Sequence, residues 1–292
     1  MKDVKKTRGD RKDGQRVRDL DIMHKAMPFL LPKRTEAEVY LNETIDVTNA
    51  LIYIKQKNEE GPGYKMTLFH LILSGLAKTV IHRPYLNRFI SGRRYYQRRE
   101  VSFSFVAKQE FSDKGEESMM VLRADGDTTL DVIGRTVAGV VKDVRNAGGN
   151  ELDGVVKTLV SLPRPLLRLV ATGLNVLEYY GKVPADFSAM LPQYTTVFIA
   201  NLGSIKCGAP YHHLTNFGTN SIMITIGEIH KEYRIGSDGT PQIRDVVELG
   251  ATLDERIADG FYFARSIKLL KYLLEHPYLL EAPFSLEVNT DD

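Results

Sequence analysis

The sequence has little of what marks an extracellular, membrane-spanning or nucleic-acid-binding protein. Its one cysteine, Cys207, excludes an intramolecular disulfide and favours a reducing compartment. It contains no run of about twenty apolar residues and no apolar signal core at the N-terminus. The 39 basic and 37 acidic residues leave a net charge of +2, so no overall field attracts nucleic acid. We therefore expect a cytoplasmic protein that does not bind nucleic acid.

Several motifs of catalysis are also missing. The chain has no glycine-rich phosphate loop of the Walker or dinucleotide type, no zinc-ligand spacing and no serine-histidine-aspartate signature. We therefore expect neither a metal nor a flavin.

What is present is an ordinary globular composition, with 292 residues of which 43% are hydrophobic and 26% charged. This length suits one large domain or two medium ones. Residues 1–19 mix eight basic side chains with four acidic ones and have only Val4 and Val17 as β-branched apolar residues. Such a segment buries too little to order itself, so we expect a flexible basic arm. The arm could be a solvated or subunit-docked tail, or it could bind an anionic lipid or nucleic acid.

Periodicity predicts alternating strands and helices from residue 38 onward. Val101, Phe103 and Phe105 alternate with serines, which is typical of a strand with one buried face. Valines and an isoleucine recur at helical spacing over 131–145. The pattern favours an α+β protein or a two-layer sandwich with a mixed sheet. The expected strands are 38–47, 86–90, 93–97, 101–108 and 118–123, and the expected helices are 46–57, 67–82 and 131–145.

Residues 159–191 are apolar and helical in pattern. Leu166, Leu167, Val170, Leu174 and Leu177 recur at helical spacing. Two prolines and two arginines near the start argue against a membrane span. The segment could lie in the plane of a membrane or bind a partner. Alternatively, it is an insertion packed on the core or across a subunit interface.

The last third leads into a charged turn followed by a helix. Strands are expected over 194–203, 221–229 and 242–253, and the last delivers the chain into the turn 254–260. Apolar residues at spacings of three and four then predict a helix that stops at His276-Pro277. A charged loop between a strand and a helix is a common place for chemistry. In the alternative, Asp259 only caps the helix and Arg256 is only a solvated neighbour.

The order of five stretches resembles the catalytic domain of the dihydrolipoyl acyltransferases of 2-oxoacid dehydrogenase complexes, which shares its fold with chloramphenicol acetyltransferase. The stretches cover most of residues 38–280. The resemblance implies a two-layer α/β sandwich with a mixed sheet over residues 20–280, with 159–191 as an insertion and 281–292 as an acidic tail. The five stretches are YLNETIDVTNAL, HRPYLNRFISGRRYYQRREVSFSFVA, FIANLG, SDGTPQIRDVVEL and DERIADGFYFARSIKLLKYLLEHPYLL.

The resemblance also implies a site and a reaction. In this family, an aspartate-histidine-arginine-x-x-aspartate-glycine motif supplies a histidine base that takes a proton from the thiol of coenzyme A or dihydrolipoamide. The thiol then attacks a thioester. Asp254, Arg256, Asp259 and Gly260 match the motif, while Glu255 stands at the histidine position.

A second position also departs from the family pattern. The residue before Asn201, Leu202 and Gly203 is Ala200, where the family usually has a hydroxyl that stabilises the oxyanion. Loss of a general base costs about 10² to 10⁴ in rate, and loss of an oxyanion donor costs about 10² to 10³. If the two losses are independent, they multiply to roughly 10⁴ to 10⁷.

Several residues are candidates to replace the lost groups. Glu255 could act as the base if burial raised its pKa, because an ordinary glutamate lies about four units below a thiol. Alternatively, Arg256 and Arg265 hold Glu255 ionised in an ion pair. His213, or its neighbour His212, could substitute as the base, or the two could be an ordinary packed or surface pair. Cys207 could serve as a nucleophile and Ser204 as a replacement hydroxyl.

The resemblance further implies partners. Coenzyme A or acyl-CoA is the expected substrate, and a homotrimer with its cleft between subunits is the expected assembly, alone or within a larger shell. The domain begins near the start of the chain, so we expect no lipoyl module before it. Three hypotheses follow: an acyltransferase with altered catalytic residues, a catalytically inactive scaffold or pseudoenzyme, and a membrane-surface or partner-binding protein that uses residues 1–19 and 159–191.

Overall fold

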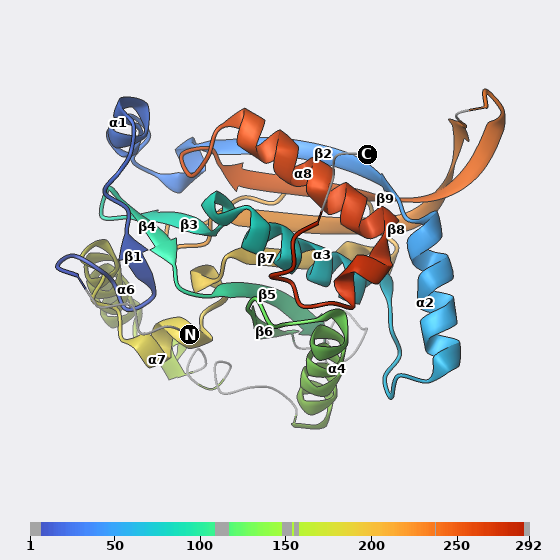
Figure 1. Ribbon diagram of the computed structural model, residues 1–292. Helices are drawn as coiled ribbons and strands as arrows, with labels where there is room; N and C mark the ends of the chain where they lie inside the picture. Colours follow the sequence, from blue (N-terminus) through green and yellow to red (C-terminus); the bar gives the residue numbers. More distant parts are fainter. Residues whose placement is uncertain (1–6, 109–116, 148–153, 155–157, 237, 289–292) are drawn as a thin grey trace.

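The fold is a mixed sheet covered on one face by helices (Figure 1). The computed structural model describes residues 7–108, 117–147, 154, 158–236 and 238–288. The predicted two-layer α/β arrangement is confirmed. The sheet order is β2-β9-β8-β7-β5-β6, formed by β2 (Glu38–Asp46), β5 (Val101–Lys108), β6 (Glu117–Ala124), β7 (Val197–Asn201), β8 (Ile222–Ile235) and β9 (Pro241–Asp254).

Among the described strands of this sheet, two pairs are parallel, β5 with β7 and β7 with β8. Strand β5 shows why the sequence folds this way, because Val101, Phe103 and Phe105 all turn into the core. β8 continues six residues beyond the predicted strand 221–229, with a register shift between Ile226 and Ile229. The bulge accounts for the break in the apolar pattern.

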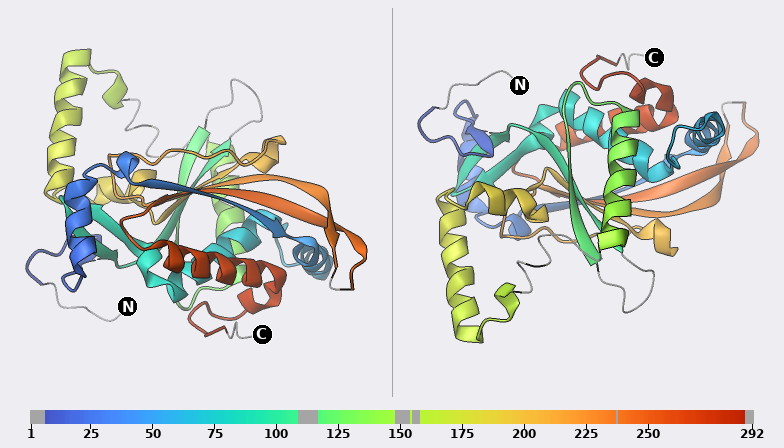
Figure 2. Two further views of the ribbon diagram at one scale, coloured as in Figure 1. Left: turned by 90° about the horizontal axis from the view of Figure 1, so that it is seen from above. Right: turned by 90° about the horizontal axis from the view of Figure 1, so that it is seen from below.

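Helices α3 (Leu68–His82) and α8 (Gly260–Glu275) pack against each other over one face of the sheet, as both views in Figure 2 agree. α4 (Leu130–Ala147) packs on β5 and β6, and α2 (Thr48–Glu60) packs beside α8. α3 is buried almost all round, which explains its nearly continuous apolar sequence. No helix in the described part of the chain is both long and apolar enough to span a bilayer.

A second, antiparallel sheet of three strands has the order β1-β4-β3. It is formed by β1 (Gly14–Arg16), β3 (Arg88–Ser91) and β4 (Arg94–Arg98). Helix α1 (Ile22–Leu30) follows β1 and was not predicted. Asp21 caps α1 by accepting a hydrogen bond from the backbone N–H of His24.

Residues 7–19 differ from the expected flexible arm, because they pack on the domain. β1 pairs with β4, and Arg11 is buried. The Arg11 guanidinium donates to Asp13 at 2.8 Å and to the Ser91 hydroxyl at 2.7 Å, and it lies over the ring of Phe89. The ion pair and ring stacking of Arg11 therefore hold this segment on the domain, although the segment has few apolar residues to bury. Residues 1–6 lie outside the described residues.

The insertion 159–191 forms α6 (Arg164–Tyr179) and α7 (Ala185–Met190). α6 stands away from the body of the chain and joins it near its C-terminal end (Figure 2). Glu178 makes the joint, because its side chain is buried and accepts hydrogen bonds from Ser91 and Tyr194. Packing along the core is therefore not observed for this helix within one chain.

The C-terminal segment also differs from the expected acidic tail. Phe284 is fully buried, and its backbone N–H donates to the Thr128 carbonyl at 3.0 Å. Glu281 accepts a hydrogen bond from Tyr53 at 2.7 Å and pairs with Lys57 at 3.1 Å. The domain thus extends beyond residue 280, because one aromatic anchor fixes a segment whose composition is otherwise polar.

We predict that the docking of residues 7–19 depends on the ionised form of Asp13. Burial raises the pKa of Asp13, but the hydrogen bond and charge of Arg11 outweigh it, so the pKa is lowered overall from its usual 3.8. Asp13→Asn should therefore reduce the free energy of unfolding by about 1–2 kcal/mol at pH 7. A lowered carboxyl pKa stabilises above the usual pKa and ceases to stabilise as the pH falls through the folded-state pKa. In urea titrations the difference from wild type should thus be complete above pH 3.8, shrink as the pH falls below it, and vanish only below the lowered folded-state pKa. Asp19→Asn, an exposed change in the same segment, is the control, and a pH-independent difference would contradict the prediction.

Candidate functional site

The turn after β9 is organised by a buried carboxylate. Asp254 is fully buried, and Arg256 is only 2% exposed. The Arg256 guanidinium donates to both Asp254 oxygens at 2.7 Å, and its Nη1 donates to the Leu31 carbonyl at 2.7 Å. This is a two-pronged arginine–carboxylate pair, which fixes both partners in a single geometry. Arg256 is therefore a buried structural partner of Asp254. The alternative prediction, that Arg256 is only a solvated neighbour, is wrong.

A second arginine, Arg34, completes this network. Its Nε lies 3.7 Å from an Asp254 oxygen, and its other nitrogens donate to the carbonyls of Thr215 at 2.5 Å and Gly218 at 3.1 Å. Burial lowers the pKa of Arg34, while the charge of Asp254 acts in the opposite direction. Sequence reasoning missed Arg34. The only signal is a basic residue just before β2, the strand that pairs with β9.

Glu255 lies between Asp254 and Arg256 in sequence but is itself only partly buried. Its backbone N–H donates to the Ala37 carbonyl at 2.9 Å. The expected ion pair does not form within the chain, because Arg256 is committed to Asp254 and Arg265 is exposed, with its guanidinium 6.0 Å from the ring centre of Phe261. Among the described residues, none makes a hydrogen bond or an ion pair with the Glu255 carboxylate.

Asp259 and Gly260 close the turn. The Asp259 carboxylate accepts a hydrogen bond from the backbone N–H of Tyr262 at 2.7 Å and so caps α8. Both residues are exposed. A side chain at Gly260 would meet no atom within 4 Å, so packing within this chain does not require glycine there. The position is open to an approaching molecule.

The histidine pair lies at the same corner of the molecule. The backbone N–H of Leu214, which follows His213, donates to the Glu38 carboxylate at 2.6 Å, and Glu38 stands opposite Asp254 in the β2–β9 ladder. The imidazole Nδ1 of His213 lies 3.0 Å from the Leu214 carbonyl and can only donate to it. The neutral ring then keeps Nε2 as a free proton acceptor. His212 is held in the same way, with its ring 4.7 Å from that of His213.

The predicted oxyanion turn lies further along the sheet, away from the turn at 254–260. Ala200 stands level with Thr225 on β8, and Thr225 stands level with Gly250 on β9. Asp254 is four residues further along β9, which is about 13 Å at roughly 3.3 Å per residue. One chain therefore does not bring Ala200 and Asn201 together with Glu255.

Local packing explains the shape of the oxyanion turn. A Cβ on Gly203 would lie 2.2 Å from the Gly227 carbonyl oxygen, so only glycine fits there. The Ser204 hydroxyl is already bonded to the Asn201 carbonyl at 2.8 Å, which weakens its case as a replacement donor. Cys207 is a free, exposed cysteine a few residues beyond this turn.

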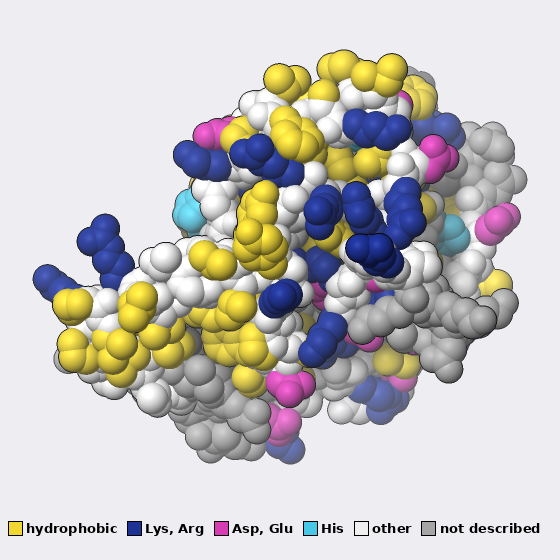
Figure 3. Space-filling model, turned by 90° about the vertical axis from the view of Figure 1, so that its left-hand side faces the viewer, with side chains coloured by type: hydrophobic (Ala, Val, Ile, Leu, Met, Phe, Trp, Pro, Cys, Tyr) yellow, Lys and Arg dark blue, Asp and Glu magenta, His cyan; other side chains and the backbone are white. Residues whose placement is uncertain are grey.

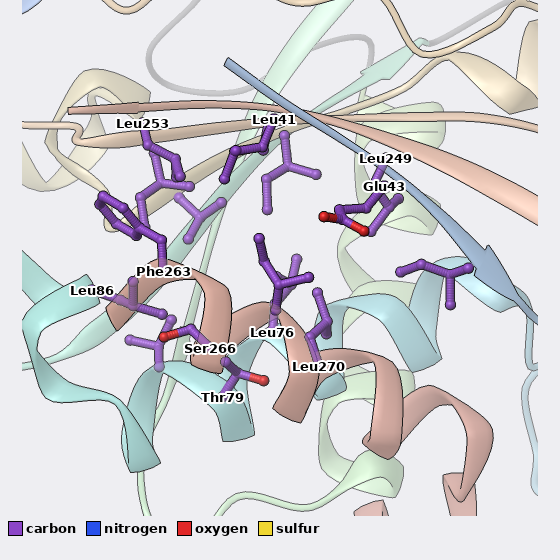
Figure 4. Close-up of a pocket in the computed structure, with 17 residues that line it drawn as sticks. Leu41, Glu43, Leu76, Thr79, Leu86, Leu249, Leu253, Phe263, Ser266 and Leu270 are labelled. Atoms are coloured by element: carbon purple, nitrogen blue, oxygen red, sulfur yellow. The ribbon is translucent and has the colours of Figure 1, made fainter. Parts of the chain in front are cut away.

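A small apolar cavity of about 70 Å³ lies between the sheet and helices α3 and α8 (Figure 4). Most of its walls are leucine, isoleucine and valine side chains, with Glu43 at one end, where it pairs with Lys271 at 2.5 Å. None of the predicted site residues lines it. The cavity is therefore a gap in the core, separate from the turn at 254–260. Within the described ranges, no group of histidine, cysteine and carboxylate side chains could hold a metal ion.

Comparisons with known proteins point to one fold. No family model matches the chain. The lipoamide acyltransferase component of the branched-chain α-keto acid dehydrogenase complex of Bacillus subtilis is 22% identical over 249 residues, which cover 83% of this chain and 48% of that protein. The chain thus spans about half the length of this curated relative.

Solved structures agree with this match. A probable dihydrolipoamide acetyltransferase of Listeria monocytogenes aligns with a TM-score of 0.59 and 17% identity over 90% of this chain and 95% of that one. The dihydrolipoamide acetyltransferase of Azotobacter vinelandii gives 0.60 and 17% over 90% and 93%. Chloramphenicol acetyltransferase gives 0.53 and 10% over 89% and 99%. The chain therefore has the fold of the dihydrolipoamide acyltransferase catalytic domain, which is also that of chloramphenicol acetyltransferase.

Proposed function

We propose that the protein is an acyltransferase that moves an acyl group between the thiol of coenzyme A, or another thiol, and an acceptor, with Glu255 as the general base. One observation carries the proposal. The Asp254–Arg256 pair of the family motif is retained as a buried frame, and the carboxylate between them has no partner in the described part of the chain. An ion pair that served only stability would have engaged that carboxylate.

The chemistry requires a higher proton affinity at Glu255 than a glutamate has in water. A thiol titrates near pH 8.5 and a free glutamate near 4.3, and burial raises a carboxyl pKa because it disfavours the charged form. Glu255 is partly buried in the single chain. A substrate or a second subunit that covers this position would exclude the remaining solvent from the Glu255 carboxylate.

The second candidate base is His213. Its Nδ1 is held by a backbone carbonyl, which leaves Nε2 ready to accept a proton. His213 precedes Leu214, whose backbone N–H donates to the Glu38 carboxylate. Glu38 stands opposite Asp254 in the β2–β9 ladder. An imidazole held in this way is a common general base.

We further propose that the complete cleft forms between chains of a trimer. The proposal is supported by the separation of the two halves of the site, since the Ala200–Asn201 turn lies about four residues further along the sheet than the end of β9, which leads into Glu255. A neighbouring chain would bring its Ala200–Asn201 turn to Glu255. The fold also occurs in the cubic core of the pyruvate dehydrogenase multienzyme complex, so this architecture is compatible with assembly.

A catalytically inactive scaffold of the same fold is the alternative. It is favoured by the two departures from the family motif, because Ala200 offers no hydroxyl to an oxyanion and Glu255 replaces the histidine. The two proposals differ in one measurable property, which is turnover of an acyl-thioester.

We predict that Glu255→Gln reduces acyl transfer from acetyl-CoA to dihydrolipoamide by about 10² to 10⁴, because the amide cannot accept the thiol proton. The assay follows release of free coenzyme A thiol. Glu275→Gln, an exposed change at the end of α8, is the matched control and should leave the rate unchanged. Activity that survives in Glu255→Gln but is lost in His213→Gln would move the base to His213. Coenzyme A binding without any turnover in the wild-type protein would favour the scaffold.

We predict that Arg256→Met lowers the free energy of unfolding by about 3–5 kcal/mol, because it leaves the Asp254 charge buried without its main partner. Chemical denaturation measures the change. Lys268→Met on the exposed side of α8 is the control and should stay within about 0.5 kcal/mol of wild type. Equal effects of the two substitutions would show that the pair does not organise the turn.

We predict that the protein is a trimer, or a multiple of three chains, at micromolar concentration. Light scattering coupled to size-exclusion chromatography measures the mass, which is 33.0 kDa for one chain. A monomer would contradict the two-chain cleft, because one chain holds only half of the proposed site.

A further inference from the structure

One side of the molecule combines positive charge with exposed apolar side chains (Figure 3). Lysine and arginine side chains gather near the middle of this side, and hydrophobic side chains cover the projecting α6 and the region of α1. Neither feature belongs to the proposed acyl-transfer site. Together they define what we call the basic face, formed by residues 8–30, 92–94 and α6.

The centre of the basic face is a wide hollow whose lining includes cations but no carboxylates. Arg93 lies with its guanidinium 5.3 Å from the ring centre of Phe29, which is itself exposed on α1. No acidic residue lines the hollow, so the charge that it presents to solvent is entirely positive. The cations in its lining are Arg8, Arg16, Arg18, Lys25, Arg93 and Arg94.

The acidic residues of the same segment are turned inward. The Asp10 side chain is fully buried and accepts hydrogen bonds from the backbone N–H groups of Thr7 and Arg16. Asp13 pairs with the buried Arg11. Residues 7–19 carry five basic and three acidic side chains, and folding engages two of the acids within the chain while it leaves most of the bases at the surface.

Helix α1 borders the hollow on one side. Lys25 stands on α1 and points its charge toward the hollow, while four apolar residues of the same helix are exposed to solvent. A helix in a soluble chain normally turns such residues to the core. The four are Ile22 at 83%, Met23 at 63%, Phe29 at 62% and Leu30 at 67% exposure.

Helix α6 borders the other side and is amphipathic. At 3.6 residues per turn, its leucines, Val170 and Val176 fall on about half of its circumference, and Arg164 and Arg168 fall on the other half. Leu169 and Val176 are 68% and 52% exposed, so the apolar half is not buried by the described part of the chain. Apolar residues opposite arginines are the pattern of helices that lie in a membrane interface.

We propose that the basic face docks on an anionic membrane surface. The apolar residues of α1 and α6 would enter the boundary between headgroups and acyl chains, while the cations between them contact lipid phosphate and carboxylate groups. A small soluble anion would occupy the hollow and leave both apolar helices exposed to water. A membrane satisfies the charge and the apolar surface together, and that is why it fits better than a free phosphate compound.

Vesicle flotation of the full-length protein tests the proposal. At low salt, the protein should float with phosphatidylcholine vesicles that contain about one-third phosphatidylserine, and should not float with pure phosphatidylcholine. Leu169→Glu with Val176→Glu removes the apolar contact of α6, and Lys25→Glu with Arg94→Glu reverses charge at the hollow. Each pair should reduce the bound fraction at least about tenfold.

Matched controls separate this face from general stickiness. Tyr233→Glu with Ile235→Glu changes two side chains that are each 78% exposed on the β8–β9 ribbon, and Lys55→Glu with Lys268→Glu changes exposed lysines on α2 and α8. Both control pairs should bind like wild type, and all four should keep the wild-type unfolding midpoint.

Four outcomes would overturn the proposal. The first is a wild-type protein that ignores anionic vesicles, and the second is a control pair that loses binding as fully as the face variants. The third is complete release of the protein by millimolar coenzyme A, which would assign the hollow to a soluble phosphate ligand. The fourth is a change in oligomer mass for the α6 pair without any change in vesicle binding, which would assign α6 to a second copy of the chain.

Discussion

The structure depends on one buried charge, the carboxylate of Asp254. A carboxylate taken out of water is costly unless its oxygens are paired, and Arg256 occupies both oxygens while Arg34 adds a second positive charge. Meeting that requirement draws in the segment before β2, the end of β9 and the loop 211–218. These three segments are far apart in sequence, and together they form the corner that holds Glu255 and the histidine pair.

The same constraint separates the two parts of the candidate site. Both arginines are committed to Asp254, and the Glu255 carboxylate has no partner in the described residues, while strand register fixes the Ala200–Asn201 turn about four residues further along the sheet. A reaction that uses both needs a second chain. In the proposed acyltransferase, the buried Asp254–Arg256 pair would serve as the frame of the site, and the carboxylate of Glu255 would take the place of an imidazole.

Periodicity was enough to predict most of the sheet and helices. β5 and α8 follow directly from apolar residues at spacings of two and of three or four, because those spacings set which side faces the core. The docked N-terminal segment was not predictable in this way. Arg11 holds it through an ion pair with Glu178, which is distant in sequence, and through a stack over the ring of Phe89. In the C-terminal segment, Phe284 is buried as an isolated aromatic residue, so the sequence there shows no apolar periodicity. The motif located Asp254 and Arg256, but Arg34 is joined to them only through the fold, so no local pattern could reveal it.

The most direct measurement for the central claim is a structure of the assembled protein with coenzyme A bound. We predict that the thiol sulfur lies near a Glu255 carboxylate oxygen, within direct or one-water hydrogen-bond reach, and that the Ala200–Asn201 turn facing it comes from a neighbouring chain. A thiol held elsewhere, with the Glu255 carboxylate in an ion pair across the subunit contact, would contradict a catalytic role for Glu255.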